Sequence, residues 1–138
     1  MSRIWMLDTN TISCIVRGKS PAARARLESV KGDETACISV ITEAELRYGT
    51  AKKAPEPVRQ AALNILFDRL RILPWTSEEA LVYGDLRAKL ERAGKVLGNL
   101  DMLIAAQAIS ANATLVTRDK AFAQVEGLHT PVNWAVDL

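Results

Sequence analysis

The chain of 138 residues is poor in the side chains that bind soft metals or form disulfides, with two cysteines and a single histidine. Cys14 and Cys37 have neither metal-ligand spacing nor a histidine nearby, and each lies in an apolar stretch. We therefore expect two free thiols in a reduced, cytoplasmic compartment. His129 stands in the carboxyl-terminal tail and is better explained as a tail residue than as a catalytic base.

Strong charge and long apolar runs are also missing. The net charge is only +2 and there is no basic tail, so charge alone does not indicate a nucleic-acid binder. The amino-terminal apolar run ends at Asp8, so we expect neither a signal peptide nor a membrane span. Aromatic residues make up 5% of the chain, and Trp5, Trp75 and Trp134 are predicted to pack in or beside the core. The composition predicts one globular domain over residues 1–138.

Short apolar segments alternate with helical patterns along the chain. Strands are predicted at 4–7, 35–40, 72–75 and 114–117, with a further edge strand at 128–134; helices are predicted at 11–17, 20–30, 42–54, 58–71, 77–92 and 100–112, with a short helical turn at 119–123. Ser77 is predicted to cap the longest helix. The alternation is typical of the α/β class, with a mostly parallel sheet of four to five strands between helices on both faces.

Four acidic positions meet at one end of this predicted sheet: Asp8, an acid of the 42–54 helix, Asp101 and Asp119. Ligands bind beyond the carboxyl ends of parallel strands. Each acid also has a simpler explanation, since Asp8 or Asn10 and likewise Asp119 can cap a following helix, and Asp101 can complement a helix dipole. However, Asp101 shares a helix face with apolar residues such as Ile104, and a buried charge needs a partner.

The 42–54 helix offers two acids, which its geometry separates. Residues two apart on a helix point about 200° apart, so at most one of Glu43 and Glu45 faces the site. Glu43 has Arg47 four residues later, in the favourable order for an exposed ion pair. Glu45 has no basic partner at that spacing. We therefore assign Glu45 to the site and Glu43 to the surface.

Four carboxylates at one place repel one another strongly. Two charges ~4 Å apart repel by ~4 kcal/mol at an effective dielectric of ~20, so the cluster needs protons or a divalent cation. Oxygen donors alone favour Mg²⁺ or Mn²⁺, which can activate water for phosphodiester chemistry. The predicted ligands are Asp8, Glu45, Asp101 and Asp119. Short polar side chains that could orient them or the water are Thr9, Asn10, Asn99 and Thr117.

Four motifs spread over the chain resemble those of one known family. They are MLDTN at 6–10, SVITEAELRYG at 39–49, GNLDMLIAA at 98–106 and LVTRDKAF at 115–122. In this order they resemble the PIN-domain ribonucleases, and within them the VapC-type toxins of toxin-antitoxin modules. The resemblance implies a three-layer PIN-like domain over residues 1–138.

The resemblance also implies a function. The chain would be a metal-dependent endoribonuclease that leaves a 3′ hydroxyl and a 5′ phosphate, and its motif style is similar to that of enzymes that cut the anticodon loop of initiator tRNA. Asp8, Glu45 and Asp101 would hold the metal, and Asp119 would stand where many VapC-type chains have Asn. A VapB-type antitoxin would cover the acidic groove with its carboxyl-terminal arm, and the toxin would be a homodimer within a larger complex that binds promoter DNA through the antitoxin.

An acidic site that cuts a polyanion needs basic residues on its rim. The candidates for RNA binding are Arg17, Lys19, Arg47, Lys95 and Arg118, although ordinary solvated surface is the better explanation for any single one of them.

Two rival functions are weighed against the nuclease. A haloacid-dehalogenase-like phosphatase needs a second acid two residues after the first, where this chain has Asn10. A non-catalytic interaction module with a degenerate site would lack one of the four acids, and none is missing.

Overall fold

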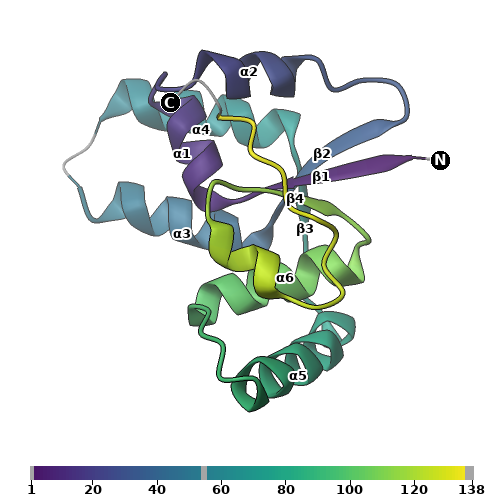
Figure 1. The fold of residues 1–138 in the computed structure, drawn as a ribbon. Coiled ribbons are helices and arrows are strands. Elements are labelled where there is room, and N and C mark those ends of the chain that lie inside the picture. The colour runs from purple at the N-terminus through teal and green to yellow at the C-terminus, as the bar shows by residue number, and fades with distance from the viewer. Residues whose placement is uncertain (1, 54–55, 136–138) are drawn as a thin grey trace.

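The computed structural model of the protein describes residues 2–53 and 56–135, which form a four-stranded parallel sheet (Figure 1). The strands are β1 (Arg3–Leu7), β2 (Glu34–Ser39), β3 (Arg71–Leu73) and β4 (Thr114–Val116), in the spatial order β3-β2-β1-β4. Met6 of β1 lies opposite both Cys37 of β2 and Leu115 of β4. The predicted α/β class with a parallel sheet is confirmed.

Helices connect the strands and cover both faces of the sheet. They are α1 (Thr9–Val16), α2 (Pro21–Glu28), α3 (Val40–Ala51), α4 (Pro57–Arg69), α5 (Ser77–Arg92) and α6 (Asn99–Ser110), followed by the 3-10 helix η1 (Lys120–Gln124). Figure 1 shows α1, α2 and α4 on one side of the sheet, and α5 and α6 on the other. Among the described residues, no helix is both long and apolar enough to cross a membrane.

Strand periodicity divides the core into two layers. Trp5 and Leu7 point to the face covered by α1, α2 and α4, whereas Met6 between them points to the face covered by α5 and α6. Leu7 and Met6 are fully buried. Because both faces are covered, the strands need no polar face, which explains the unbroken apolar run before Asp8.

Capping residues begin the helices close to the predicted positions. Ser20 caps α2 through its Oγ, which accepts a hydrogen bond from the Ala23 N–H at 3.1 Å, and Pro21 is the first helical residue, as predicted. The longest helix, α5, is capped by Thr76, so the prediction of Ser77 was wrong by one residue. The reason is a capping box, in which the Thr76 N–H donates to Glu79 Oε1 at 2.7 Å.

Several other helix ends also differ from prediction, and those of α3 and α6 are examples. The 42–54 helix was predicted to end at Ala54, which lies outside the described residues, while α3 is helical to Ala51. Helix α6 ends at Ser110 instead of Asn112, because Asn112 adopts φ 54°, the left-handed conformation that stops a helix.

The carboxyl-terminal segment does not form the edge strand predicted at 128–134. Among the described residues it makes one parallel bridge, between Val132 and Val116, with the Thr117 N–H donating to the Val132 carbonyl at 2.8 Å. Pro131 has no N–H to extend the ladder. The segment is held instead by Trp134, whose ring centroid lies 5.6 Å from that of Trp5.

Candidate active site

The carboxyl ends of the two neighbouring strands β1 and β4 bring Asp8 and Thr117 together. Leu7 pairs with Val116 in the sheet, so the residues that follow them also lie opposite each other. The Asp8 N–H donates to the Val116 carbonyl at 3.0 Å, which continues the ladder by one bond. The polar residues after both strands therefore face the same point beyond the sheet.

Asp8 is a buried carboxylate, 5% exposed, with both oxygens bonded. Its Oδ1 accepts from the Thr11 N–H at 2.9 Å and caps α1, and its Oδ2 accepts from the Thr117 hydroxyl at 2.5 Å. The capping explanation is thus correct for one oxygen. The second oxygen is fixed by a residue 109 positions away, which local helix capping does not require.

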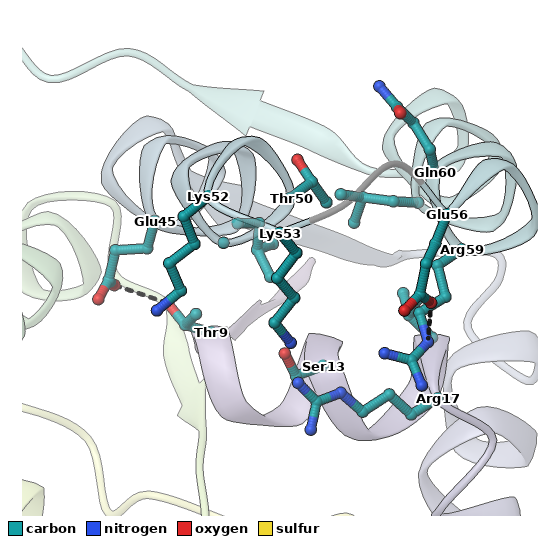
Figure 2. A pocket seen from close by; sticks show the side chains of 14 residues that line it. Thr9, Ser13, Arg17, Glu45, Thr50, Lys52, Lys53, Glu56, Arg59 and Gln60 are labelled. Atoms are coloured by element: carbon teal, nitrogen blue, oxygen red, sulfur yellow. Dashed lines mark hydrogen bonds and ion pairs between the residues drawn. The ribbon is translucent and has the colours of Figure 1, made fainter.

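Glu45 and Glu43 lie on different faces of α3, as the helix geometry predicts. The Thr9 hydroxyl donates to Glu45 Oε1 at 2.6 Å, linking α1 to α3 across the site (Figure 2). Glu43 instead forms the predicted ion pair with Arg47, at 2.7 Å. Glu45 therefore faces the carboxyl ends of the strands, and Glu43 is neutralised on the surface.

Asp101, in the first turn of α6, lies where the charges of the other acids meet. Burial raises the pKa of Asp101 above its ordinary value of 3.8. The charges of three acids raise this pKa further, in decreasing order Asp119, Glu45 and Asp8. No lysine or arginine forms an ion pair with Asp101 among the described residues. The carboxylate thus lies in an excess of negative charge.

Asp119 is exposed and caps η1, its Oδ1 accepting from the Ala121 N–H at 2.9 Å. Its own N–H donates to the Thr117 hydroxyl at 3.0 Å. The Thr117 hydroxyl therefore accepts from the backbone of one predicted site acid and donates to the carboxylate of another, Asp8. This single hydroxyl joins the ends of the site contributed by β1 and β4.

The donor chemistry of these acids fits a hard divalent cation. All four candidate ligands are carboxylates, and the charges of the other three act on Asp101, which forms no ion pair within the described residues. Among the described residues, no three acidic, histidine or cysteine side chains are grouped closely enough to hold a metal ion as they stand. Asp8 and Glu45 each accept a hydrogen bond from a threonine hydroxyl, Thr117 for Asp8 and Thr9 for Glu45.

The predicted supporting residues divide into two groups. Thr9 and Thr117 each donate a hydrogen bond to a site carboxylate. Asn10 and Asn99 are exposed, and neither side chain makes a hydrogen bond within the described part of the chain. His129 bonds to Asn112 at 2.7 Å on the surface.

A pocket of about 240 Å³ lies between α1, α3 and α4, with Glu45 at one end. Val16, Leu46 and Leu63 are among its apolar lining residues. Figure 2 shows Lys52 and Lys53 reaching from α3 toward α1, and Arg59 of α4 paired with Glu56.

Lys52 and Lys53 are not among the residues predicted from the sequence. Both follow Glu45 by about two helical turns, so the same periodicity argument could have placed them on this face.

Only three of the five candidate RNA-binding residues line a common pocket. Arg17, Lys19 and Arg118 line a second pocket beside α1. Arg47 is paired with Glu43 and its guanidinium carbon lies 4.9 Å from the centroid of the Phe67 ring. Lys95 is exposed after α5, outside both pockets.

Comparison with known proteins identifies the class to which this fold and site belong. Residues 5–128 match the family model described as the PIN domain. The chain is 38% identical over 126 residues to "Ribonuclease VapC2" of Rickettsia felis, covering 91% of this chain and 94% of that protein. It is 34% identical over 128 residues to the "tRNA(fMet)-specific endonuclease VapC" of Shigella flexneri, covering 91% of this chain and 95% of that one.

A solved structure gives the same result in three dimensions. The crystal structure of VapBC2 from Rickettsia felis bound to a DNA fragment from the promoter contains a chain that superposes with a TM-score of 0.85 at 37% identity, covering 91% of this chain and 95% of that chain. The present chain therefore belongs to the PIN-domain family and, within it, to the VapC ribonucleases. These findings favour neither the phosphatase nor the non-catalytic module.

Proposed function

We propose that this protein is the toxin of a type II toxin-antitoxin system and acts as an Mg²⁺- or Mn²⁺-dependent endoribonuclease. The observation that carries the proposal is the gathering of carboxylates beyond the ends of β1 and β4, where Asp8 and the backbone of Asp119 both bond to Thr117 and Glu45 bonds to Thr9. The charges of these three acids also raise the pKa of Asp101, which forms no ion pair among the described residues. An acidic centre of this kind at the carboxyl edge of a parallel sheet suits a divalent ion and phosphodiester hydrolysis. The VapC relatives support RNA as the substrate.

Four acids are the proposed metal ligands, and threonine hydroxyls hold two of them in place. Asp8, Glu45, Asp101 and Asp119 would hold the ion or ions. When bound, a divalent ion supplies an activated water and neutralises the charge that develops on the phosphate. Thr117 holds Asp8 through its hydroxyl, and Thr9 holds Glu45 in the same way. Both threonines thereby keep carboxylates aimed at the site before the substrate arrives.

The proposed reaction leaves a 3′ hydroxyl and a 5′ phosphate. The substrate class is single-stranded RNA or an RNA loop, because unpaired bases are the part of RNA that proteins read specifically. The anticodon loop of initiator tRNA is the specific candidate, supported by the name of the Shigella flexneri relative. A panel of tRNA transcripts cut by the purified protein would test this choice.

The proposed partner is a VapB-type antitoxin, supported by the VapBC complex among the similar structures. We place its carboxyl-terminal arm over the acidic groove beside Glu45. The toxin would form a homodimer within a larger toxin-antitoxin complex in the cytoplasm, and promoter DNA would be bound through the antitoxin. Co-expression with the neighbouring short reading frame should yield a complex that does not cut RNA.

The activity is tested with the purified, antitoxin-free protein and single-stranded RNA. Cleavage is expected with Mg²⁺ or Mn²⁺ and should be lost in EDTA and in Asp8→Asn and Asp101→Asn variants. Undiminished cleavage in EDTA would refute the metal requirement. If no RNA were cut under any condition, the endoribonuclease proposal would be wrong.

A further inference from the structure

A second pocket, of about 400 Å³, lies against α1 next to the end of β4. It is distinct from the pocket between α1, α3 and α4, although Ser13 and Arg17 line both. Its lining residues are Asn10, Ser13, Cys14, Arg17, Lys19 and Arg118. Three of these six are cations and none is an acid.

The three cations of this pocket have no carboxylate partner in the part of the chain that the structure describes. Arg17, Lys19 and Arg118 are exposed, and none of them forms an ion pair within the described residues. Within residues 2–53 and 56–135, the cations that do form ion pairs are Arg26, Arg47, Arg59, Arg87 and Lys89. Three unpaired positive charges around one hollow attract an anion.

Arg118 is anchored on the wall of this pocket. Its Nη1 lies 3.5 Å from the Sγ of the buried Cys14, as a donor to the sulfur. This weak contact orients the guanidinium without neutralising it. Figure 2 shows the long side chain of Arg17 running along α1 toward Ser13. Arg118 follows β4 and Arg17 follows α1, and both line the second pocket. A guanidinium fork matches the oxygens of a phosphate.

Two residues that line the pocket are close neighbours in sequence of acids in the proposed site. Asn10 is two residues after Asp8, and Arg118 immediately precedes Asp119. A strongly acidic site repels RNA, so the substrate backbone must be held by cations beside it.

We infer that this basic pocket, defined by Arg17, Lys19 and Arg118, binds one backbone phosphate of the RNA and so fixes which neighbouring linkage lies over the acids. Asn10 and Ser13 add neutral hydrogen-bond donors to the same pocket. The inference rests on the proposed ribonuclease function. It also selects among the candidate RNA-binding residues: Arg47 is already paired with Glu43, and Lys95 lies outside the pocket.

The test uses an RNA oligonucleotide that the wild-type protein cuts at one site. A set of variants of this RNA is made, each with one backbone phosphate replaced by an uncharged linkage. Each oligonucleotide carries one methylphosphonate at a different position, and KM and kcat are measured for each. In wild type, one position near the cut should raise KM about tenfold, because a charge-assisted hydrogen bond is lost there. With Arg118→Gln or Arg17→Gln, KM for the unmodified RNA should rise to a similar extent. For these variants, the uncharged linkage at that same position should not raise KM further.

Matched controls are Lys31→Gln and Arg69→Gln. Both residues are exposed cations without an ion pair in the described residues, and they precede β2 and β3 at the amino-terminal edge of the sheet, opposite the site. They should leave KM and the position dependence unchanged. Arg118→Lys keeps the charge and should fall between wild type and Arg118→Gln. Unchanged thermal unfolding of each variant shows that the fold is intact.

The outcomes separate this inference from the proposed function. If RNA is cut but Arg17→Gln and Arg118→Gln respond to each neutral linkage as wild type does, the pocket is not a phosphate site and the ribonuclease stands. If wild type cuts no RNA, the proposed function fails, and the same scan by fluorescence anisotropy decides whether the pocket binds RNA. The slope of log binding constant against log salt concentration should become smaller by about 1 in Arg118→Gln, which would support phosphate binding in the pocket. An unchanged slope would overturn the inference.

Discussion

Replacing Thr117 by valine should weaken the fold and the active site at the same time. The Thr117 hydroxyl donates to Asp8 Oδ2 at 2.5 Å and accepts from the Asp119 N–H at 3.0 Å. Valine has nearly the same shape, so it leaves no cavity but removes both bonds. Asp8 is 5% exposed, so water has little access to replace the lost donor. A hydrogen bond to a charged group is worth about 1.5–3 kcal/mol, so the free energy of unfolding should fall by about 2 kcal/mol.

Urea unfolding of wild type, Thr117→Val and Thr117→Ser measures this effect, with RNA cleavage measured on the same samples. Serine keeps the hydroxyl and loses only a methyl group, so it should cost about 1 kcal/mol of stability and retain most of the activity. Valine should reduce cleavage at least tenfold, since Asp8 is no longer held in place. Wild-type stability in Thr117→Val, or equal loss of activity in the serine and valine variants, would refute the positioning role of this hydroxyl.

The remaining predictions concern three other groups. Glu45→Gln should reduce cleavage about 100-fold or more by analogy with other electrostatic site residues, while Glu43→Gln should retain it; the opposite result would show that the helix-face assignment is wrong. Burial would raise the pKa of Glu79, but hydrogen bonds from Thr76 and Ser110 outweigh it and lower this pKa below 4.5. Its charge therefore stabilises the fold above that pH, and this stability is lost as the pH falls through the lowered pKa. Glu79→Gln should flatten the acid limb of a stability-versus-pH curve, and an unchanged limb would contradict this. Burial raises the pKa of Cys37 to about 12, so a thiol reagent at pH 8 should label Cys37 only on unfolding; rapid labelling of native protein would disprove its burial.

Local geometry explains which parts of the site could be predicted from the sequence. The 100° step of a helix separates Glu43 from Glu45 without any tertiary information, and the structure shows the resulting Glu43–Arg47 pair. Likewise, the carboxyl end of a parallel strand predicts where Asp8 points. Capping by Asp8 does not exclude a site role, because one carboxylate oxygen caps α1 and the other accepts a hydrogen bond from Thr117.

The parts that could not be predicted depend on how elements pack. The strand order β3-β2-β1-β4 makes β1 and β4 neighbours and so brings Thr117 to Asp8, yet no local pattern specifies that order. The basic pocket has the same origin, because Arg17 and Arg118 are 101 residues apart and meet only through α1 and the end of β4. The failure of the predicted edge strand is local, since Pro131 removes the hydrogen bond that would extend it.

The central claim is that the acids around Asp101 bind a divalent ion, and a crystal soaked in Mn²⁺ tests it most directly. Anomalous scattering should place manganese against Asp8 and Asp101, with Glu45 or Asp119 turned toward the ion from its present hydrogen bond. The Asp101→Asn variant, soaked in the same way, should lose most of the signal. An anomalous peak elsewhere on the protein, or none at Asp8 and Asp101, would contradict the account.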